Sequence, residues 1–281
     1  MSDLENKIDF VMFVSASGAN PNGDPLNANR PRTDCDGFGE ISDVCIKRKI
    51  RNRMQSLGNA IFVQSDAFSD DGAKSLRERA GCLSKVKDPQ EFARQACEKW
   101  LDVRSFGQVF AFDKKDFTCP SVGVRGPVCV HRAVSLHPVE VVSMQITRCA
   151  SGDVRYGMRS SDTMGTKHFV RFGLYEIKGS VNVRLAKKTG FSAEDAQILK
   201  ECLRTLFVDD ASSARPDGSM EVVKLFWFEH GCMDGSVPSA RIHRAVHAAL
   251  AEGVSLPKSA ADYVFSCDEI EGVSLEIIDG I

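Results

Sequence analysis

The segment that most constrains the fold is residues 8–15, IDFVMFVS, which carries apolar side chains at nearly every position. Successive side chains of a strand point to opposite faces of a sheet. A strand that is apolar on both faces must therefore be covered on both, as a strand in the middle of a sheet is. We predict a central strand here.

The remaining elements follow in an order that indicates the fold class. Ser42 and Ser192 each precede apolar residues at helical spacing, which predicts two helices that start there. β-rich segments cover residues 121–148, 168–186 and 220–230. The order β, α, β, β, α, β is typical of α+β folds of the ferredoxin-like type, which include the RNA-recognition motif.

Three segments depart from that plan. Residues 16–40 are dense in Gly, Pro, Asn and Asp, which predicts a long irregular loop. Residues 65–103 are largely polar and helical, with a break near Lys87–Pro89, and residues 147–168 form a polar arm between two strands. Residues 239–250 are expected to form a late helix. No linker is visible, so we expect a single domain over residues 1–281 with insertions.

Composition excludes several classes of protein. No apolar run approaches the roughly 20 residues of a membrane helix, and no secretory signal begins the sequence. The ten cysteines contain no CxxC pair, so a zinc ribbon or thioredoxin-like site has no support. We expect a cytoplasmic protein with reduced thiols, no membrane contact and no cofactor.

Charge is unevenly distributed along a chain whose net charge is −2. Residues 125–188 hold eleven basic and four acidic groups, and residues 189–281 hold seven and sixteen. Five basic residues fall within the seven positions from 47 to 53. This asymmetry favours a polyanionic partner for the basic part of the chain.

The basic helix and the long loop are the first candidate binding elements. Lys47 and Arg51 are helical neighbours of like charge, and a bound phosphate chain would relieve their repulsion. A solvated helix face is the alternative. In the loop, Arg30 and Arg32 flank Pro31 on a stiff support, although a long surface loop would look the same.

Two further segments combine cations with side chains that stack. Arg104 and Phe106 precede Gly107, a combination that can stack on bases, although core packing explains Phe106 about as well. The arm interleaves Arg148, Arg155, Arg159 and Lys167 with Tyr and Met side chains such as Met158. Such an arm suits wedging into a nucleic-acid strand, or it is an ordinary surface hairpin.

Two motifs raise metal chemistry. Asp24, Asp34 and Asp36 could hold Mg²⁺ for phosphodiester cleavage, but aspartates in such loops usually form turns. His243 and His247 have the HxxxH spacing of two metal ligands, without a clear third ligand.

Several segments together resemble a known family. NPNGDP, SDVCIKRKIRN, DVRSFGQVFA, VRGPV and TMGTKHFVRFGLY occur in order and are similar to the backbone subunit of CRISPR Cascade complexes. This is the Cas-seven family, with the best likeness to its type I-C branch, also described as DevR-like. The resemblance covers roughly residues 8–230.

The resemblance implies an RRM-like palm with a helical finger region at about residues 57–103 and a β-hairpin thumb at about residues 147–168. It implies a non-catalytic subunit that polymerises head to tail along the CRISPR RNA (crRNA) spacer, supports pairing with a target DNA strand and contacts other Cascade subunits. A metal-dependent target-RNA endoribonuclease, as in type III complexes, and a transcriptional or developmental regulator are the alternatives.

Motifs, charge and resemblance together predict a set of RNA-binding residues, with no catalytic residue and no metal ligand. They are Asn20, Asn22, Asp24, Arg30, Arg32, Lys47, Arg48, Lys49, Arg51, Arg104, Phe106, Gln108, Arg125, Arg148, Arg155, Met158, Arg159, Lys167 and His168.

Overall fold

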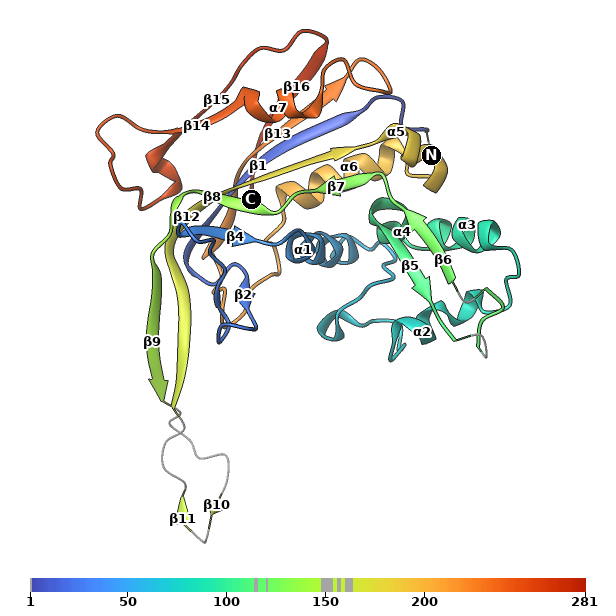
Figure 1. The fold of residues 1–281 in the computed structure, drawn as a ribbon, viewed down its shortest axis with the longest axis horizontal. Coiled ribbons are helices and arrows are strands. Elements are labelled where there is room, and N and C mark those ends of the chain that lie inside the picture. The colour runs from blue at the N-terminus through green and yellow to red at the C-terminus, as the bar shows by residue number, and fades with distance from the viewer. Residues whose placement is uncertain (1, 114–115, 120, 148–153, 156–157, 160–163) are drawn as a thin grey trace.

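A large antiparallel sheet organises the chain (Figure 1). The computed structural model describes residues 2–281 except 114–115, 120, 148–153, 156–157 and 160–163. Within these residues, eight strands form the sheet: β1 (Ile8–Ala19), β4 (Phe38–Ile41), β7 (Val128–Val130), β8 (Ala133–Pro138), β9 (Val141–Thr147), β12 (Met164–Val181), β13 (Met220–His230) and β16 (Val273–Asp279). Its main strand order is β16-β13-β1-β12-β8-β4, and β7 and β9 also pair with β12.

The predicted central strand is confirmed. β1 pairs with β12 on one side and with β13 on the other, so that Ile8 lies opposite both Val181 and Glu229. Every β1 residue from Ile8 to Ala16 is buried. The apolar side chains on both faces of residues 8–15 are explained by a covering layer on each face.

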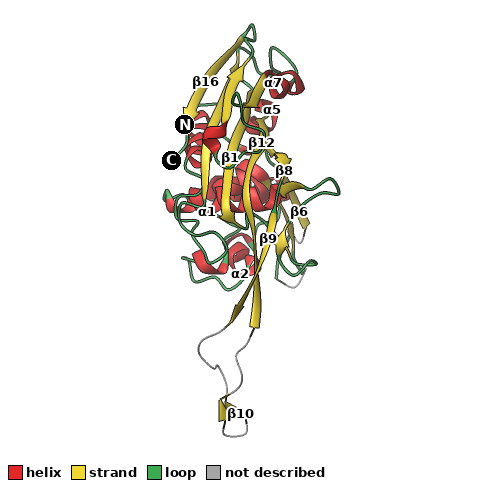
Figure 2. Cartoon of the chain, turned by 90° about the vertical axis from the view of Figure 1, so that its left-hand side faces the viewer, coloured by secondary structure: helices red, strands yellow, loops and turns green. Residues whose placement is uncertain are grey.

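Helices form the layer on one face of the sheet, and a short helix with a hairpin forms the layer on the other. Phe10 and Met12 of β1 pack with α1 (Asp43–Ser56), α5 (Val183–Thr189) and α6 (Ala193–Arg204). Val11 and Phe13 pack with α7 (Ser239–Ala245) and with the hairpin of β14 (Val246–Leu250) and β15 (Tyr263–Cys267). Figure 2 shows the sheet between these layers.

The two predicted helix starts are confirmed by their caps. Ser42 Oγ accepts a hydrogen bond from Cys45 N at 3.3 Å at the start of α1. Ser192 Oγ accepts one from Asp195 N at 3.1 Å, and Asp195 Oδ2 accepts one from Ser192 N at 3.0 Å. This reciprocal capping box satisfies two backbone donors that a helix end would otherwise leave unpaired.

A small lobe follows α1 and has its own apolar core. Its elements are η1 (Asp66–Phe68), α2 (Leu76–Arg79), η2 (Ala80–Leu83), α3 (Pro89–Lys99), α4 (Leu101–Phe106), β5 (Gly107–Ala111) and β6 (Ser121–Arg125). Phe62, Phe92, Trp100 and Phe110 are the large side chains of that core. The elements of the lobe run from Asp66 to Arg125.

Two expectations about local structure were wrong. Residues 239–250 are not one helix, because α7 ends at Ala245 and β14 pairs with β15 from Val246↔Cys267 to Leu250↔Tyr263. Residues 16–40 are less irregular than expected, since β1 runs to Ala19 and the short strands β2 (Gly23–Asp24) and β3 (Arg30–Pro31) pair before β4. In both places strand pairing with distant residues overrides local propensity.

An arm leaves the body of the sheet. β9 pairs with the first part of β12 from Val141↔Val170 to Thr147↔Met164. Within the segment that this ladder brackets, β10 (Val154–Arg155) pairs with β11 (Met158–Arg159). In Figures 1 and 2 the β9–β12 ladder projects well beyond the remainder of the molecule.

No helix in the described ranges is long and apolar enough to cross a membrane. The nine cysteines for which the structure gives a state are all free thiols.

Gly179→Ala is expected to destabilise the sheet at its most crowded point. A Cβ at Gly179 of β12 would lie 2.1 Å from Phe10 Cζ and 2.6 Å from the Cys129 carbonyl oxygen. Overpacking of this kind costs about 1–3 kcal/mol, which denaturant unfolding would measure. Gly123→Ala in β6 is the matched control, because a Cβ there meets nothing within 4 Å. Equal losses of stability for both variants would contradict the packing explanation.

Candidate nucleic-acid interface

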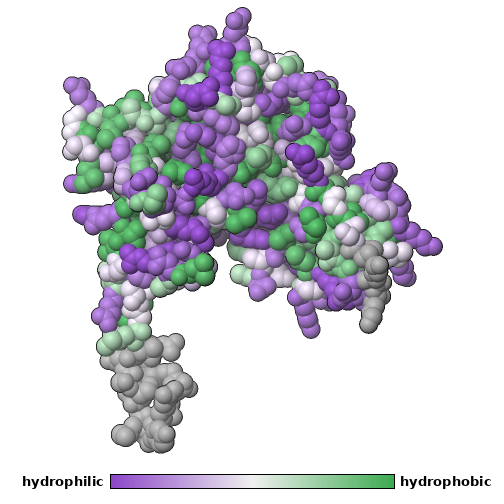
Figure 3. Space-filling model, viewed as in Figure 1, coloured by the Kyte–Doolittle hydropathy of each residue, from purple (hydrophilic) through white to green (hydrophobic). Residues whose placement is uncertain are grey.

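A notch lies between two projections on the same side of the molecule. The β9–β12 arm forms one wall and the small lobe forms the other, with α1 and the β2–β3 hairpin between them (Figure 1). The space-filling view shows this notch as open, with many hydrophilic side chains at its edges (Figure 3). A groove bordered by two projections is the part of this chain best shaped to hold an extended strand.

Side chains of the β2–β3 loop tie the loop to α1. Asn22 Oδ1 accepts hydrogen bonds from both the backbone N and the Oγ of Ser42, each at 2.9 Å. The buried Asn20 donates from Nδ2 to the Asn29 carbonyl oxygen at 2.7 Å. Asn20 and Asn22 therefore hold the backbone of the loop against the start of the basic helix, whatever else they contact.

The same loop reaches the base of the arm. Arg30 Nη1 donates to Ser143 Oγ of β9 at 2.8 Å, and His168 Nδ1 lies 2.9 Å from the same oxygen. Arg30 and His168, which are 138 positions apart in the sequence, are thus brought together on Ser143. Ser143 was not predicted, because nothing in its local sequence distinguishes it from other polar residues of a strand.

The basic residues of α1 divide into two groups. Lys47 forms an ion pair with Asp43 at 3.0 Å, one turn earlier on the surface of the same helix. Arg48 donates from Nη1 to the Val63 carbonyl oxygen at 2.6 Å and is half-buried. These two side chains are partly exposed on α1 and are not paired with a buried carboxylate.

Lys49 and Arg51 are used within the fold instead. Lys49 is 5% exposed and forms an ion pair with Asp210, which also contacts Arg215. Burial lowers the pKa of the Lys49 ammonium, and the Asp210 carboxylate opposes that shift. Arg51 Nε donates to Asp102 Oδ2 at 3.0 Å, and Asp102 is completely buried.

Two aspartates from outside α1 therefore neutralise part of the charge of the basic helix. Asp102 comes from α4, and Asp210 comes from the loop after α6, both far from α1 in sequence. Asp102 also accepts hydrogen bonds from Phe62 N at 2.7 Å and Val63 N at 3.0 Å. Sequence reasoning missed both aspartates because partners distant in the chain leave no local signal.

The small lobe carries four of the predicted residues, with different environments. Arg104 donates two 2.8 Å hydrogen bonds to Asp195, which is 2% exposed, so this guanidinium holds α4 against α6. The Arg51 guanidinium lies over the Phe106 ring at 5.0 Å. Gln108 Nε2 donates to the neighbouring Val109 carbonyl oxygen, and Arg125 is exposed on β6.

Part of the predicted arm lies beyond the described structure. Arg148 lies outside the described residues, and for Arg155, Met158 and Arg159 the structure describes the backbone pairing of β10 with β11. Lys167 is half-buried in β12, opposite Met144. Lys167 and His168 at the base of the arm are thus the predicted arm residues whose surroundings are defined.

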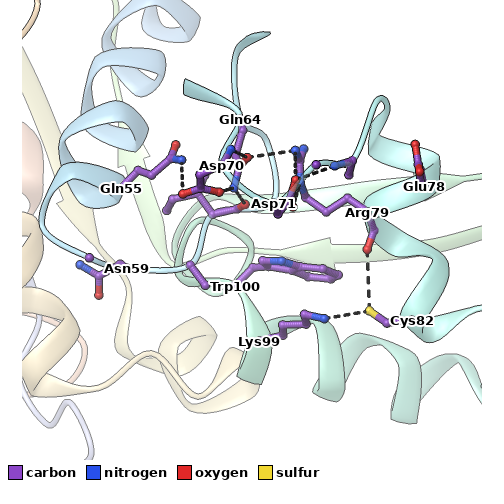
Figure 4. Close-up of a pocket in the computed structure, with 15 residues that line it drawn as sticks. Gln55, Asn59, Gln64, Asp70, Asp71, Glu78, Arg79, Cys82, Lys99 and Trp100 are labelled. Atoms are coloured by element: carbon purple, nitrogen blue, oxygen red, sulfur yellow. Dashed lines mark hydrogen bonds and ion pairs between the residues drawn. The ribbon is translucent and has the colours of Figure 1, made fainter. Parts of the chain in front are cut away.

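A cavity of about 650 Å³ opens where α1 meets the small lobe (Figure 4). Gln55 of α1 donates to Asp70 Oδ2 at 2.8 Å, and Gln64 donates to Asp70 Oδ1 at 2.9 Å. Arg79 continues the chain of hydrogen bonds to Gln64 Oε1 at 3.0 Å. The network joins α1 to the lobe and so helps to fix the width of the notch.

The aspartates of the nuclease hypothesis act in turns. Asp24 Oδ1 accepts from Leu26 N and pairs with Arg32 at 3.3 Å. Asp34 Oδ1 accepts from the backbone N of Asp36 and of Phe38. Among the described residues no group of three His, Cys, Asp or Glu side chains could hold a metal ion.

The HxxxH motif is also explained by the fold. His243 lies in the last turn of α7 and His247 lies in β14, so they do not share the face of one helix. His247 contacts Asp268 at 3.1 Å.

Comparison with solved structures shows that the fold is shared with other proteins. A chain of a CRISPR RNA-guided surveillance complex in a pre-nicking state superposes with a TM-score of 0.51, covering 89% of this chain and 84% of that chain. A second chain, of a CRISPR RNA-guided surveillance complex, gives a TM-score of 0.50 and covers 89% and 78%. Both are 18% identical to this chain, so the likeness shows a shared fold.

Comparison of sequences identifies the family. CRISPR-associated protein Cas7 of Haloferax volcanii is 26% identical over 219 residues, which are 72% of this chain and 64% of that relative, a little under two thirds of its length. The family model for CRISPR-associated protein Cas7 matches residues 6–268. The chain belongs to the Cas7 family, which confirms the family resemblance seen in the sequence.

Lys49→Met is expected to destabilise the protein by about 3 kcal/mol, because it removes one partner of a buried ion pair. This value is the lower end of the usual range, since Arg215 still contacts Asp210 in the variant. Lys47→Met is the matched control. Its exposed i,i+4 pair with Asp43 contributes about 0.5 kcal/mol or less. Denaturant unfolding of both variants measures the difference in their free energies of unfolding. Equal destabilisation by Lys47→Met and Lys49→Met would show that burial of Lys49 does not cause the larger loss of stability.

Proposed function

We propose that this chain is a non-catalytic backbone subunit that binds CRISPR RNA in a type I-C Cascade surveillance complex in the cytoplasm. The observation that carries the proposal is the notch between the arm and the small lobe (Figures 1 and 3). Its neighbouring elements carry Lys47 and Arg48 on α1, Arg30 on β3, Lys167 on β12 and Arg125 on β6. Membership of the Cas7 family supports the same function.

In this proposal the sheet and its helices are a ferredoxin-like, RRM-like palm. The strand order β13-β1-β12-β8, with α1 and α6 packed on one face, supports that description. The small lobe is the finger region and the β9–β12 arm is the thumb. The whole chain of residues 1–281 acts as one unit, because Arg104–Asp195 and Arg51–Asp102 tie the lobe to the helical layer.

Phosphate contact falls to the cations that the fold leaves available. Arg30 and Arg48 bond to neutral oxygens of Ser143 and Val63, so their charges can still attract phosphate. Lys47, Lys167 and the exposed Arg125 supplement them. Lys49, Arg51 and Arg104 support RNA binding through the shape of the fold, since Lys49 is itself buried in its pair with Asp210, and Arg51 and Arg104 are held by the buried carboxylates of Asp102 and Asp195.

Binding through phosphate and shape fits a protein that delegates sequence recognition to base pairing. Guide RNA would read the target DNA strand, and the protein would hold the guide in place. Copies that stack head to tail make a heterologous interface, which generates a helical filament when the rotation does not close. Other Cascade subunits would cap that filament.

Lys47→Ala combined with Arg48→Ala is expected to weaken RNA binding equally for unrelated guide sequences. The slope of log K against log salt should fall by about 0.7–1 for each phosphate that the variant no longer neutralises. Fluorescence anisotropy with two guides over a range of salt concentrations measures both effects. Lys187→Ala with Lys188→Ala, both exposed in α5, is the charge-matched control. A decrease in affinity that depends on the guide sequence, or an equal decrease in the control, contradicts the proposal.

Deletion of residues 150–163 is expected to leave the protein folded, because the β9–β12 ladder from Val141↔Val170 to Thr147↔Met164 lies outside the deletion. The assembled variant should no longer protect guide RNA at a regular spacing, since we propose that the thumb of each copy separates successive segments of the guide RNA. Nuclease footprinting tests this, with thermal unfolding as the control for folding. An unchanged periodic footprint would remove the thumb from the proposal.

A further inference from the structure

A second cavity lies away from the notch. It has a volume of about 470 Å³ and is lined by the end of β8, part of β12 and the loop between β14 and β15. Its apolar walls are Phe172, Leu174, Leu256 and Pro257. We call it the flap pocket, and we call residues 251–262 of that loop the flap, because Leu256, Pro257 and Lys258 of the loop line it. Its volume falls within the roughly 300–1,000 Å³ of ordinary small-molecule sites.

The flap pocket opens on the face of the sheet opposite α1. Leu174 and Phe172 pack with Val11 and Phe13 in the core cluster under α7 and the β14–β15 hairpin. The residues of α1 pack in the cluster on the other face. A ligand in the flap pocket is therefore separated by the sheet from a strand bound along α1.

Two polar side chains meet inside the pocket. His137 Nδ1 lies 2.9 Å from the Tyr263 hydroxyl, and the two rings are 5.7 Å apart. Burial raises the pKa of the Tyr263 phenol to about 12, so the hydroxyl keeps its proton. The bond through Nδ1 leaves the Nε2 edge of the imidazole for a ligand. This pair can both donate and accept hydrogen bonds within an otherwise apolar wall.

Cations stand at the mouth. Arg171 is exposed and pairs with Glu140 at 3.1 Å, and Lys258 is exposed on the flap. Of the described residues that line the pocket, Glu140 is the single acidic one, and it is already paired. The mouth therefore carries net positive charge, which favours an anionic group on the ligand.

We propose that the flap pocket binds one nucleotide, with its base against Phe172 and Leu256 and its phosphate near Lys258 and Arg171. A base has a flat apolar face and a polar edge, which match the aromatic wall and the His137–Tyr263 pair. A purely aliphatic side chain would leave the polar pair and the cations without a partner. A cationic peptide would be repelled at the mouth.

Nucleotide binding in the flap pocket is independent of guide binding in the notch. The nucleotide could be free, or it could belong to a strand that passes this face of the sheet, and both present the same chemistry. Binding of AMP or UMP alone indicates that the site takes a free nucleotide. Tighter binding of a five-nucleotide strand than of the mononucleotide indicates that the site takes a nucleotide of a strand.

The test is titration of the full chain with AMP, UMP, adenosine and inorganic phosphate, with binding measured by calorimetry or ligand-observed NMR. AMP or UMP should bind more tightly than adenosine or phosphate alone, because both halves of the site contribute. Lys258→Ala should weaken nucleotide binding by about tenfold, as expected for loss of a charged hydrogen bond. Leu256→Glu should abolish it, since Leu256 is 70% exposed at the mouth and the substitution adds a repelling charge.

Matched controls separate the site from general charge effects. Lys188→Ala removes an exposed lysine from α5, and Val264→Glu adds a carboxylate at a position that is 59% exposed on β15 and does not line the pocket. Both should bind AMP as the unaltered protein does. Guide RNA affinity should be unchanged in Lys258→Ala and Leu256→Glu, so failure of guide binding and failure of nucleotide binding are observed separately.

Three outcomes would overturn the proposal. One is the absence of AMP and UMP binding at millimolar concentration. Another is binding that Lys258→Ala and Leu256→Glu leave unchanged. The last concerns Leu256→Cys. If association with a second copy of the chain protects this cysteine from alkylation and AMP does not, the pocket is a protein-docking site.

Discussion

The arrangement of this molecule depends on how the charges of α1 are neutralised. Five cations within seven positions would repel one another on an isolated helix. In the folded chain Asp102 from the small lobe approaches from one side and Asp210 from the loop after α6 approaches from the other. Because removal of one partner leaves a buried charge uncompensated, such pairs hold both neighbours firmly against α1. The basic helix is thus first a connector between parts of the fold.

That role changes how the charge of the helix should be interpreted. A count of basic residues predicts a strong phosphate-binding element, but two of the predicted RNA-binding residues of α1, Lys49 and Arg51, are paired with carboxylates that water reaches poorly. The charge that remains for a ligand lies on Lys47 and Arg48 and on the neighbouring Arg30. A few contacts per subunit suffice when many copies bind one strand, since multivalency multiplies weak local attraction.

The sequence allowed prediction of features that depend on neighbouring residues. The apolar run at residues 8–15 identified the central strand, and Ser42 and Ser192 identified the helix starts. The sequence did not allow prediction of features that depend on residues further along the chain. Residues 246–250 are helical by local pattern and become β14 because β15 pairs with them. Arg104 beside Phe106 looked like a stacking pair, but Asp195, 91 positions later, binds its guanidinium.

The two faces of the sheet suit different tasks because different layers cover them. On the α1 side, the notch is open with many hydrophilic side chains at its edges (Figure 3), which suits the proposed binding of a sugar-phosphate strand without reading of its bases. On the other face, residues of the loop between β14 and β15 line a pocket of about 470 Å³, a size that suits one nucleotide. β12 contributes to both, since Lys167 and His168 lie at the base of the arm and Phe172 lies in the pocket. The two sites thus share one strand but lie on opposite faces of the sheet, under different covering layers, which fits binding at one site that does not depend on occupancy of the other.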